Sequence, residues 1–138
     1  MKVEDLFYNV TTRKRALKNT AEEYNKILEV VTRYALHNPS VSFSCKKQSA
    51  TTADIQTPGG TTVEAIRVLF GNALARELIE INCSSEEYNF SATGFITNPN
   101  YSAKKGTFIF FINSKLFFPT FQSRCDDLIE ICDFRSSD

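Results

Sequence analysis

Apolar side chains recur every three or four residues between Thr20 and His37, which is the spacing of one face of a helix. At 1.5 Å per residue this helix would be about 27 Å long. Thr20 and Glu23 match a capping box at its start, and Asn38-Pro39 is expected to end it. The predicted buried stripe contains Tyr24, Ile27, Leu28, Val31, Tyr34 and Ala35.

Strict alternation follows this helix, which predicts a half-buried strand over residues 41–46. Its inward positions are Val41, Phe43 and Cys45. A second short strand is predicted around residues 52–57, because the turn-forming run Pro58-Gly59-Gly60 comes directly after it.

A second amphipathic helix is predicted to begin at Thr62 and to end at Gly71, with one further turn from Asn72 to Leu78. Its apolar side consists of Val63, Ile66, Leu69 and Phe70. Three strands are then expected, at residues 78–83, 88–98 and 105–113. We therefore predict an α+β fold, a two-layer sandwich in which two main helices cover a mixed sheet.

The strand at residues 105–113 contains an unbroken apolar run, Phe108 to Ile112. Such a run is typical of a strand that is covered on both faces. Farther on, the segment from Asp126 to Phe134 has the spacing of a short amphipathic helix, through Leu128, Ile129, Ile131 and Cys132.

Composition excludes several classes of protein. The chain has 16 Lys and Arg residues against 16 Asp and Glu residues, so net charge does not indicate nucleic-acid binding. The N-terminus has no signal-peptide pattern and no apolar run is long enough to span a bilayer, so we expect a soluble protein inside the cell. The scattered cysteines, with His37 as the only histidine, favour free buried thiols over a metal site: Cys45, Cys83, Cys125 and Cys132.

The densest cationic cluster lies near the N-terminus and consists of Arg13, Lys14, Arg15 and Lys18. Such a cluster attracts phosphate groups. On composition alone, a solvated surface turn is the better interpretation. Lys46-Lys47 and Lys104-Lys105 are weaker candidates of the same kind. No nucleophile motif, zinc motif or phosphate-binding loop is present, so the residues themselves show no catalytic machinery.

Several linked segments resemble the MutL family of DNA mismatch-repair proteins, most closely its eukaryotic branch whose member is shared by the repair heterodimers. The segments are VEDLFYN at residues 3–9 with the basic run and helix after it, VLFGNALARELIEI at 68–81, and GFITNPNYSAKKGTFIFFINSKL at 94–116. They occur in order and at plausible spacing. The resemblance covers roughly Val3 to Leu116, and it implies the transducer domain of a GHKL-type ATPase.

The resemblance implies a function and residues that carry it. Family members close around DNA when an N-terminal domain binds ATP and Mg²⁺, and the transducer domain lines a basic groove. It therefore implies duplex DNA and a second MutL-type subunit as partners, a nuclear location, and no membrane. Lys115 occupies the place of a basic DNA-contacting residue, although arginine is more usual there. The implied residues are Arg13, Lys14, Arg15, Lys18, Lys104, Lys105 and Lys115 for DNA, with Asp5, Phe7 and Asn9 at the junction with the ATPase domain.

The ATPase residues of the family would lie before Val3, and its phosphate-contacting lysine would lie beyond this chain. We therefore expect no cofactor, no metal and no catalysis from the chain alone. Residues 1–116 are interpreted as the transducer domain, with residues 1–19 as the junction. Residues 117–138 depart from the family, either as a patch on the sheet edge or as sequence from a mis-joined exon. An interaction-only fragment without useful DNA affinity is the alternative function, and an enzyme on the same fold lacks any phosphate loop here.

Overall fold

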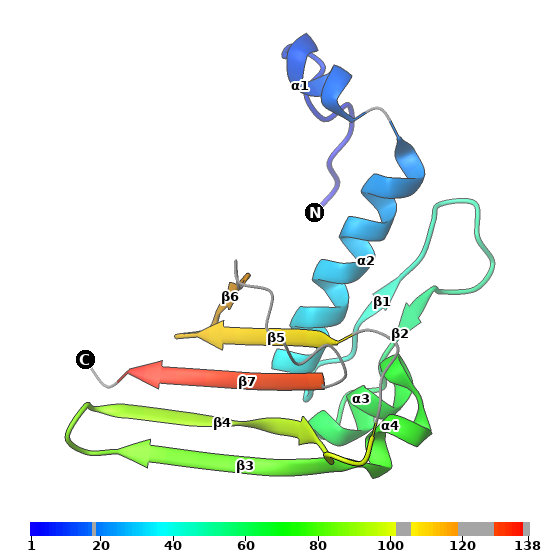
Figure 1. The fold of residues 1–138 in the computed structure, drawn as a ribbon. Coiled ribbons are helices and arrows are strands. Elements are labelled where there is room, and N and C mark those ends of the chain that lie inside the picture. Colours follow the sequence, from blue (N-terminus) through cyan, green and yellow to red (C-terminus); the bar gives the residue numbers. More distant parts are fainter. Residues whose placement is uncertain (18, 102–105, 119–128, 137–138) are drawn as a thin grey trace.

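The computed structural model describes residues 1–17, 19–101, 106–118 and 129–136 (Figure 1). Its helices are α1 (Thr11–Ala16), α2 (Thr20–His37), α3 (Thr62–Phe70) and α4 (Asn72–Arg76). Its strands are β1 (Ser44–Cys45), β2 (Ile55–Gln56), β3 (Leu78–Ser85), β4 (Phe90–Thr97), β5 (Thr107–Ile112), β6 (Lys115–Phe117) and β7 (Ile129–Ser136).

Five strands form one sheet in the order β3-β4-β7-β5-β6. β7 is antiparallel to β4 and parallel to β5, so the sheet is mixed. β1 and β2 form a separate two-stranded sheet. The predicted α+β class with a mixed sheet is confirmed.

β7 corrects the prediction of a helix from Asp126 to Phe134, because residues 129–136 form a strand at the centre of the sheet. Ile131 and Cys132 are both 6% exposed although they point to opposite faces. The isoleucines of this segment are compatible with a strand as well as with a helix. Backbone pairing with β4 on one side and β5 on the other stabilises the strand. The sheet thus includes residues beyond 116, while the division of the chain at that residue stays a prediction.

The bounds of α2 are as predicted, but its cap is not. Asn19, rather than Thr20, caps the helix: its side-chain oxygen accepts hydrogen bonds from the backbone N–H groups of Ala21 and Glu22, at 3.1 and 3.4 Å. α3 begins at Thr62, and its cap is the residue before it, Thr61. Thr61 forms a capping box there with Glu64.

The core lies between one face of the sheet and the helices. α3, α4 and the C-terminal end of α2 cover this face (Figure 1). Leu36 and Ile66 from the helices meet Ile109 and Phe111 from β5, and each of the four is at most 2% exposed. This is the two-layer arrangement that the pattern of apolar residues predicted.

Only the C-terminal part of α2 joins that core. Ala35 and Leu36 are buried, whereas Ile27 is 52% exposed and Tyr34 is 37% exposed. The predicted buried stripe is therefore wrong at Ile27 and Tyr34, whereas Tyr24, Leu28 and Val31 are half-buried. Figure 1 shows the reason: α2 extends away from the sheet toward α1.

Among the described residues, β5 is fully covered on one face only, against the prediction of cover on both. Ile109 and Phe111 are 1% exposed, whereas Ile112 is 44% exposed. β1 is also shorter than predicted, and Val41 lies outside it and is exposed.

The cysteines correct the prediction of buried thiols in part. Cys132 is buried, Cys45 is half-buried and Cys83 is exposed. Cys125 lies outside the described residues.

Candidate nucleic-acid interface

The N-terminal basic cluster is presented on α1, a helix with no buried residue. Arg13, Lys14 and Arg15 are all exposed. They lie in the last turn, where cations interact favourably with the negative end of the helix dipole. The Arg13 guanidinium lies 5.6 Å from the centre of the Phe7 ring. Among the described residues no ion pair involves these three side chains, so their charges are available to a ligand.

A tight turn precedes α1 and sets its position. Asp5 and Phe7 have positive φ angles of 50° and 62°. The carbonyl of Asp5 accepts a hydrogen bond from the Tyr8 N–H, and that of Phe7 accepts one from the Val10 N–H, both at 3.0 Å. Asn9 is exposed beside them. These contacts give Asp5 and Phe7 a local structural role, and their role at a domain junction stays a prediction.

Lys115 lies at the other end of the candidate interface, at the start of β6. It pairs with Ile112 across a two-residue turn in which Asn113 and Ser114 have positive φ angles of 48° and 63°. Both signs match a type I′ hairpin turn. The Asn113 N–H donates a hydrogen bond to the Phe134 carbonyl at 2.9 Å. The turn is thus tied to β7, and it holds Lys115 exposed at the edge of the sheet.

α2 separates the two cationic sites. The Arg33 guanidinium, which also pairs with Glu29, lies 4.7 Å from the centre of the Phe118 ring just beyond β6. From Thr20 to Arg33 the helix rises about 20 Å. α1 lies beyond that N-terminal end, so Lys115 and the α1 cluster are more than about 20 Å apart (Figure 1). Lys18, Lys104 and Lys105 lie outside the described residues.

A contact between residues far apart in the sequence attaches the β1–β2 hairpin to α2, and local patterns cannot predict it. The Tyr24 hydroxyl donates a 2.6 Å hydrogen bond to the Asp54 carboxylate, and this bond raises the pKa of the phenol. The Lys47 ammonium lies 4.8 Å from the centre of the Tyr24 ring. Lys47, a weaker candidate for phosphate binding, is thereby held close to the first turns of α2.

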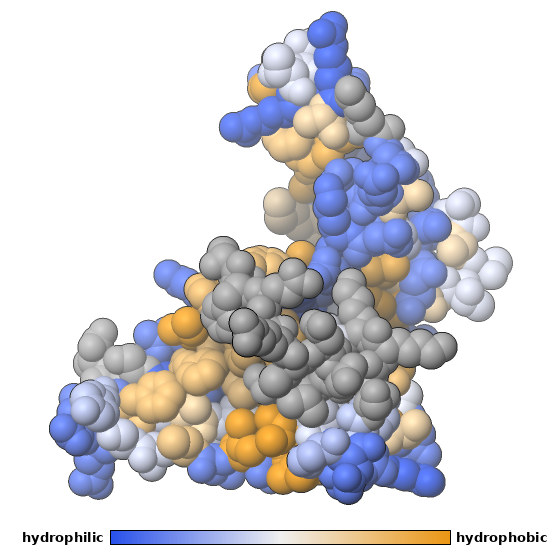
Figure 2. Space-filling view, viewed as in Figure 1, coloured by the Kyte–Doolittle hydropathy of each residue, from blue (hydrophilic) through white to orange (hydrophobic). Residues whose placement is uncertain are grey.

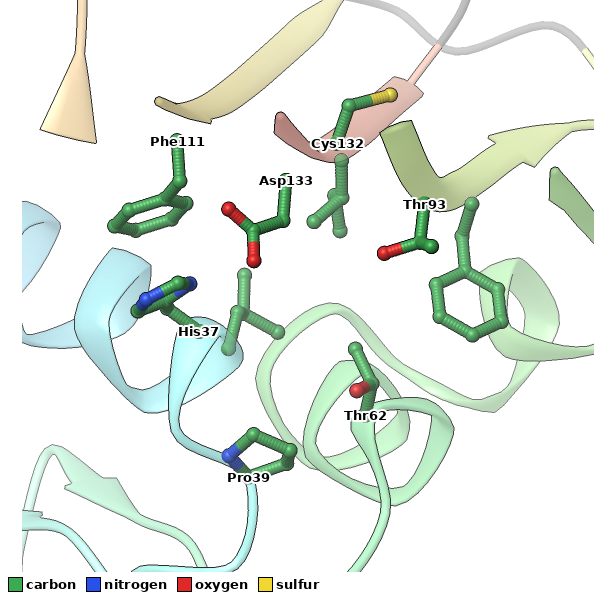
Figure 3. A pocket seen from close by; sticks show the side chains of 11 residues that line it. His37, Pro39, Thr62, Thr93, Phe111, Cys132 and Asp133 are labelled. Carbon is green, nitrogen blue, oxygen red and sulfur yellow. The ribbon is translucent and has the colours of Figure 1, made fainter. Parts of the chain in front are cut away.

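A cavity of about 200 Å³ opens on the helix-covered face, where α2 ends (Figure 3). His37 stacks on Phe111 there, with ring centres 4.1 Å apart. The Asp133 carboxylate reaches in from β7: one oxygen accepts a 3.1 Å hydrogen bond from Arg135, and the other is buried without a partner in the described part of the chain.

Comparison with known proteins decides the family. No family model matches the chain. A putative MutL protein homolog 1 of Schizosaccharomyces pombe is 42% identical over 117 residues, which are 82% of this chain and 17% of the relative. The DNA mismatch repair protein Mlh1 of Dictyostelium discoideum is 35% identical over 83% of the chain and 16% of its own length. The chain is a MutL-family homologue.

A solved structure agrees with the fold. An Aquifex aeolicus MutL ATPase domain with a point mutation superposes with a TM-score of 0.65 at 20% identity, over 99% of this chain and 51% of the solved one. The MutL homologue described here spans about a sixth of the length of the curated relatives named above. The name of the Dictyostelium discoideum relative assigns DNA mismatch repair to that whole protein.

The described part of this MutL homologue shows no group of three His, Cys, Asp or Glu side chains that could hold a metal ion. It also contains no helix with the length and apolar character that a membrane span requires. The two exposed cationic sites, on α1 and at Lys115, are features that an anionic ligand could recognise.

Proposed function

We propose that this chain is a non-catalytic transducer module of a MutL-type mismatch-repair protein, and that it binds the backbone of duplex DNA without sequence preference. The homology to mismatch-repair proteins over most of the chain supports this function. The observation that carries it is the presentation of Arg13, Lys14, Arg15 and Lys115 as exposed cations with no ion pair among the described residues.

The site suits phosphate better than bases. Contacts from lysine and arginine to phosphates fix the position of a protein on DNA but read no sequence. In the family, ATP-driven closure of the N-terminal domains brings two MutL-type subunits around DNA. We propose the same partners, a nuclear location, and a coupling role for this segment within the longer protein.

Salt dependence tests the proposal. If four cations each neutralise one phosphate, log affinity for a duplex falls against log salt with a slope of about −3 to −4. Fluorescence anisotropy of a labelled duplex measures this slope. Lys115→Glu is expected to weaken binding at low salt, because it replaces an attraction to phosphate by a repulsion.

Arg76→Glu is the matched control, because Arg76 is an exposed cation on α4, outside the proposed interface. It makes the same change in net charge and is expected to leave affinity within about twofold. Affinity that does not vary with salt, or equal effects of the two reversals, would contradict the proposal.

We further propose that the chain alone neither binds nor hydrolyses ATP, because the family's ATPase residues are expected in segments that this chain does not match. A ligand that binds only the folded state stabilises it by an amount that rises with the logarithm of ligand concentration. We therefore expect no change in melting temperature with Mg²⁺–ATP and no phosphate release above a buffer control. Phosphate release that one substitution in this chain abolished would overturn this part of the proposal.

A further inference from the structure

The face of the five-stranded sheet that points away from the helices is almost entirely apolar. Directly paired residues on neighbouring strands project to the same face, and side chains alternate along each strand. The registers therefore define the members of this face, which we call the open face. It comprises Ile79, Ile81, Cys83, Ser85, Phe90, Ala92, Gly94, Ile96, Phe108, Phe110, Ile112, Lys115, Phe117, Cys132 and Phe134, with Glu130 and Ser136 placed by register at the two ends of β7.

Aromatic rings form a continuous row across the middle of the open face. The ring centres of Phe90 and Phe134 are 5.8 Å apart, those of Phe134 and Phe110 are 5.9 Å apart, and those of Phe110 and Phe108 are 6.2 Å apart. The row crosses β4, β7 and β5, so it lies at the centre of the sheet. These rings bury one another's edges, and each remains only partly buried.

No helix in the described part of the chain covers the open face. The helices pack on the opposite face, against Ile109, Phe111 and Ile131. Figure 2 looks onto the open face and shows hydrophobic side chains gathered over the strands. At its margins Ile79 is 45% exposed and Phe117 is 44% exposed. An apolar surface of this extent marks an interaction site.

We propose that the open face is the contact surface of a homodimer, in which the open face of a second copy of this chain packs against the first. The two sheets would stack with their side chains interleaved, about 10 Å apart, as in a β-sandwich. A two-fold axis makes such a contact self-complementary, because the same patch meets itself.

Charge favours a second copy over nucleic acid. Lys115 is the only charged residue whose side chain the structure describes on this face, and it lies on the edge strand β6. Backbone register places Glu130 beside Ile96 and Phe108, at the other end of β5 from Lys115. Single-stranded nucleic acid would require a row of cations beside the aromatic rings. An apolar, nearly uncharged partner is required instead, and the open face of another copy has that chemistry.

The size of the open face sets the strength of the contact. Five strands at about 4.8 Å spacing are about 19 Å across, and six residues of strand are about 20 Å long. The flat area is roughly 400 Å² per copy, so a pair buries about 800 Å² before the relief of the side chains is counted. Interfaces below about 1,200 Å² are typical of weak, transient association. We therefore expect a dimer whose population rises with concentration.

Sedimentation velocity of the 138-residue chain over about 1–100 µM tests the inference, because a weak interface dissociates within that range. The weight-average mass is expected to rise toward twice the monomer mass. Ile79→Lys places a charge on the exposed edge strand β3, where lysine is well tolerated in a monomer. It is expected to raise the dissociation constant at least tenfold.

Val68→Lys is the matched control, because Val68 is 51% exposed and lies on α3, away from the open face. It is expected to leave the dissociation constant within about twofold of the unmodified chain. A chain that stays monomeric at the highest concentration would overturn the inference. So would equal effects of the two substitutions.

Cys83 provides a readout that needs no substitution. It is exposed and belongs to the open face, so dimerisation is expected to slow its reaction with a thiol reagent as concentration rises. Peptide mass spectrometry can follow this residue alone. A rate that does not depend on concentration would contradict the inference. Binding of a single-stranded oligonucleotide that Phe110→Ala weakens, without self-association, would identify a nucleic-acid surface instead, because bases stack on aromatic rings. Neither result depends on the binding of duplex DNA.

Discussion

Phe110 and Phe111 are neighbours in sequence and meet different surroundings. Phe111 is 1% exposed between α2 and the sheet, where it stacks on His37 and meets Tyr34 edge-on with ring centres 5.7 Å apart. Phe110 points to the open face and is half-buried among other aromatic rings. The alternation of the strand, rather than the hydrophobicity of the residues, determines which ring belongs to the core.

Truncation of the two rings is expected to have unequal effects. Phe111→Ala removes a fully buried ring and leaves a cavity, which lowers the free energy of unfolding by about 3–5 kcal/mol. Phe110→Ala is expected to cost less than half of that, because part of its ring is in contact with solvent. Urea denaturation of both variants measures the difference. Equal losses would show that the open face is as well covered as the core.

The capping box of α3 makes stability depend on pH. The Thr61 N–H donates a 2.9 Å hydrogen bond to the Glu64 carboxylate, and this contact lowers the pKa of Glu64 in the folded state. A carboxyl group with a lowered folded pKa contributes stability above its unfolded pKa, and that contribution is lost as pH falls through the folded value.

Glu64→Gln is therefore expected to destabilise the chain at pH 7 and to have a smaller effect near pH 3, where the carboxyl is protonated in both states. Thermal melts of both proteins across this range measure the change. Glu22→Gln is the control at the start of α2. A Glu64→Gln effect that is the same at both pH values would rule out this contribution.

At the scale of elements, the sequence predicted those whose pattern is set locally. α2 was predicted to the residue, because eighteen residues carry a helical spacing and Asn38 ends it. The positions of strands β1 and β2 were predicted, but their lengths were not. The hydrogen bond from Tyr24 to Asp54 could not be predicted, because it joins residues far apart in the chain. β7 was missed because its identity depends on the slot between two other strands.

Gly94 offers a direct test of that slot. A Cβ at this position would overlap the Ile131 carbonyl oxygen and lie 2.9 Å from the Cys132 Cα, both in the backbone of β7. The backbone cannot move away without breaking the β4–β7 ladder. Gly94→Ala is therefore expected to cost more than about 3 kcal/mol, at the upper end of overpacking.

Gly71→Ala is the matched control for this prediction. A Cβ there meets nothing within 4 Å, and the substitution is strained only by its φ of 95°. It is expected to cost about 1 kcal/mol. Chemical denaturation of both variants separates the two cases. If Gly94→Ala proved no worse than Gly71→Ala, β7 would not lie beside β4 in solution.

At the scale of the whole molecule, only part of the candidate site can be predicted from the sequence. The basic residues could be named from their clustering and from the family resemblance. Their separation could not, because it follows from the contact between Arg33 and Phe118 and from the length of α2. Sequence neighbours such as Arg13 and Arg15 share one end of the molecule, and Lys115 lies at the sheet.

This separation predicts that the effect of a charge reversal depends on duplex length. A separation of about 20 Å corresponds to about six base pairs at 3.4 Å each, so only a longer duplex contacts both cationic sites at once. With a duplex of about 20 base pairs, Arg13→Glu and Lys115→Glu are each expected to weaken binding, and their effects are expected to add in log affinity. With a hairpin of about four base pairs, which is about 14 Å long at 3.4 Å each, only one site binds at a time. One reversal then removes one of two alternatives and weakens binding only about twofold. Anisotropy titrations at fixed salt measure both cases, and a tenfold loss on the short hairpin from Lys115→Glu alone would show that the cations form a single compact site.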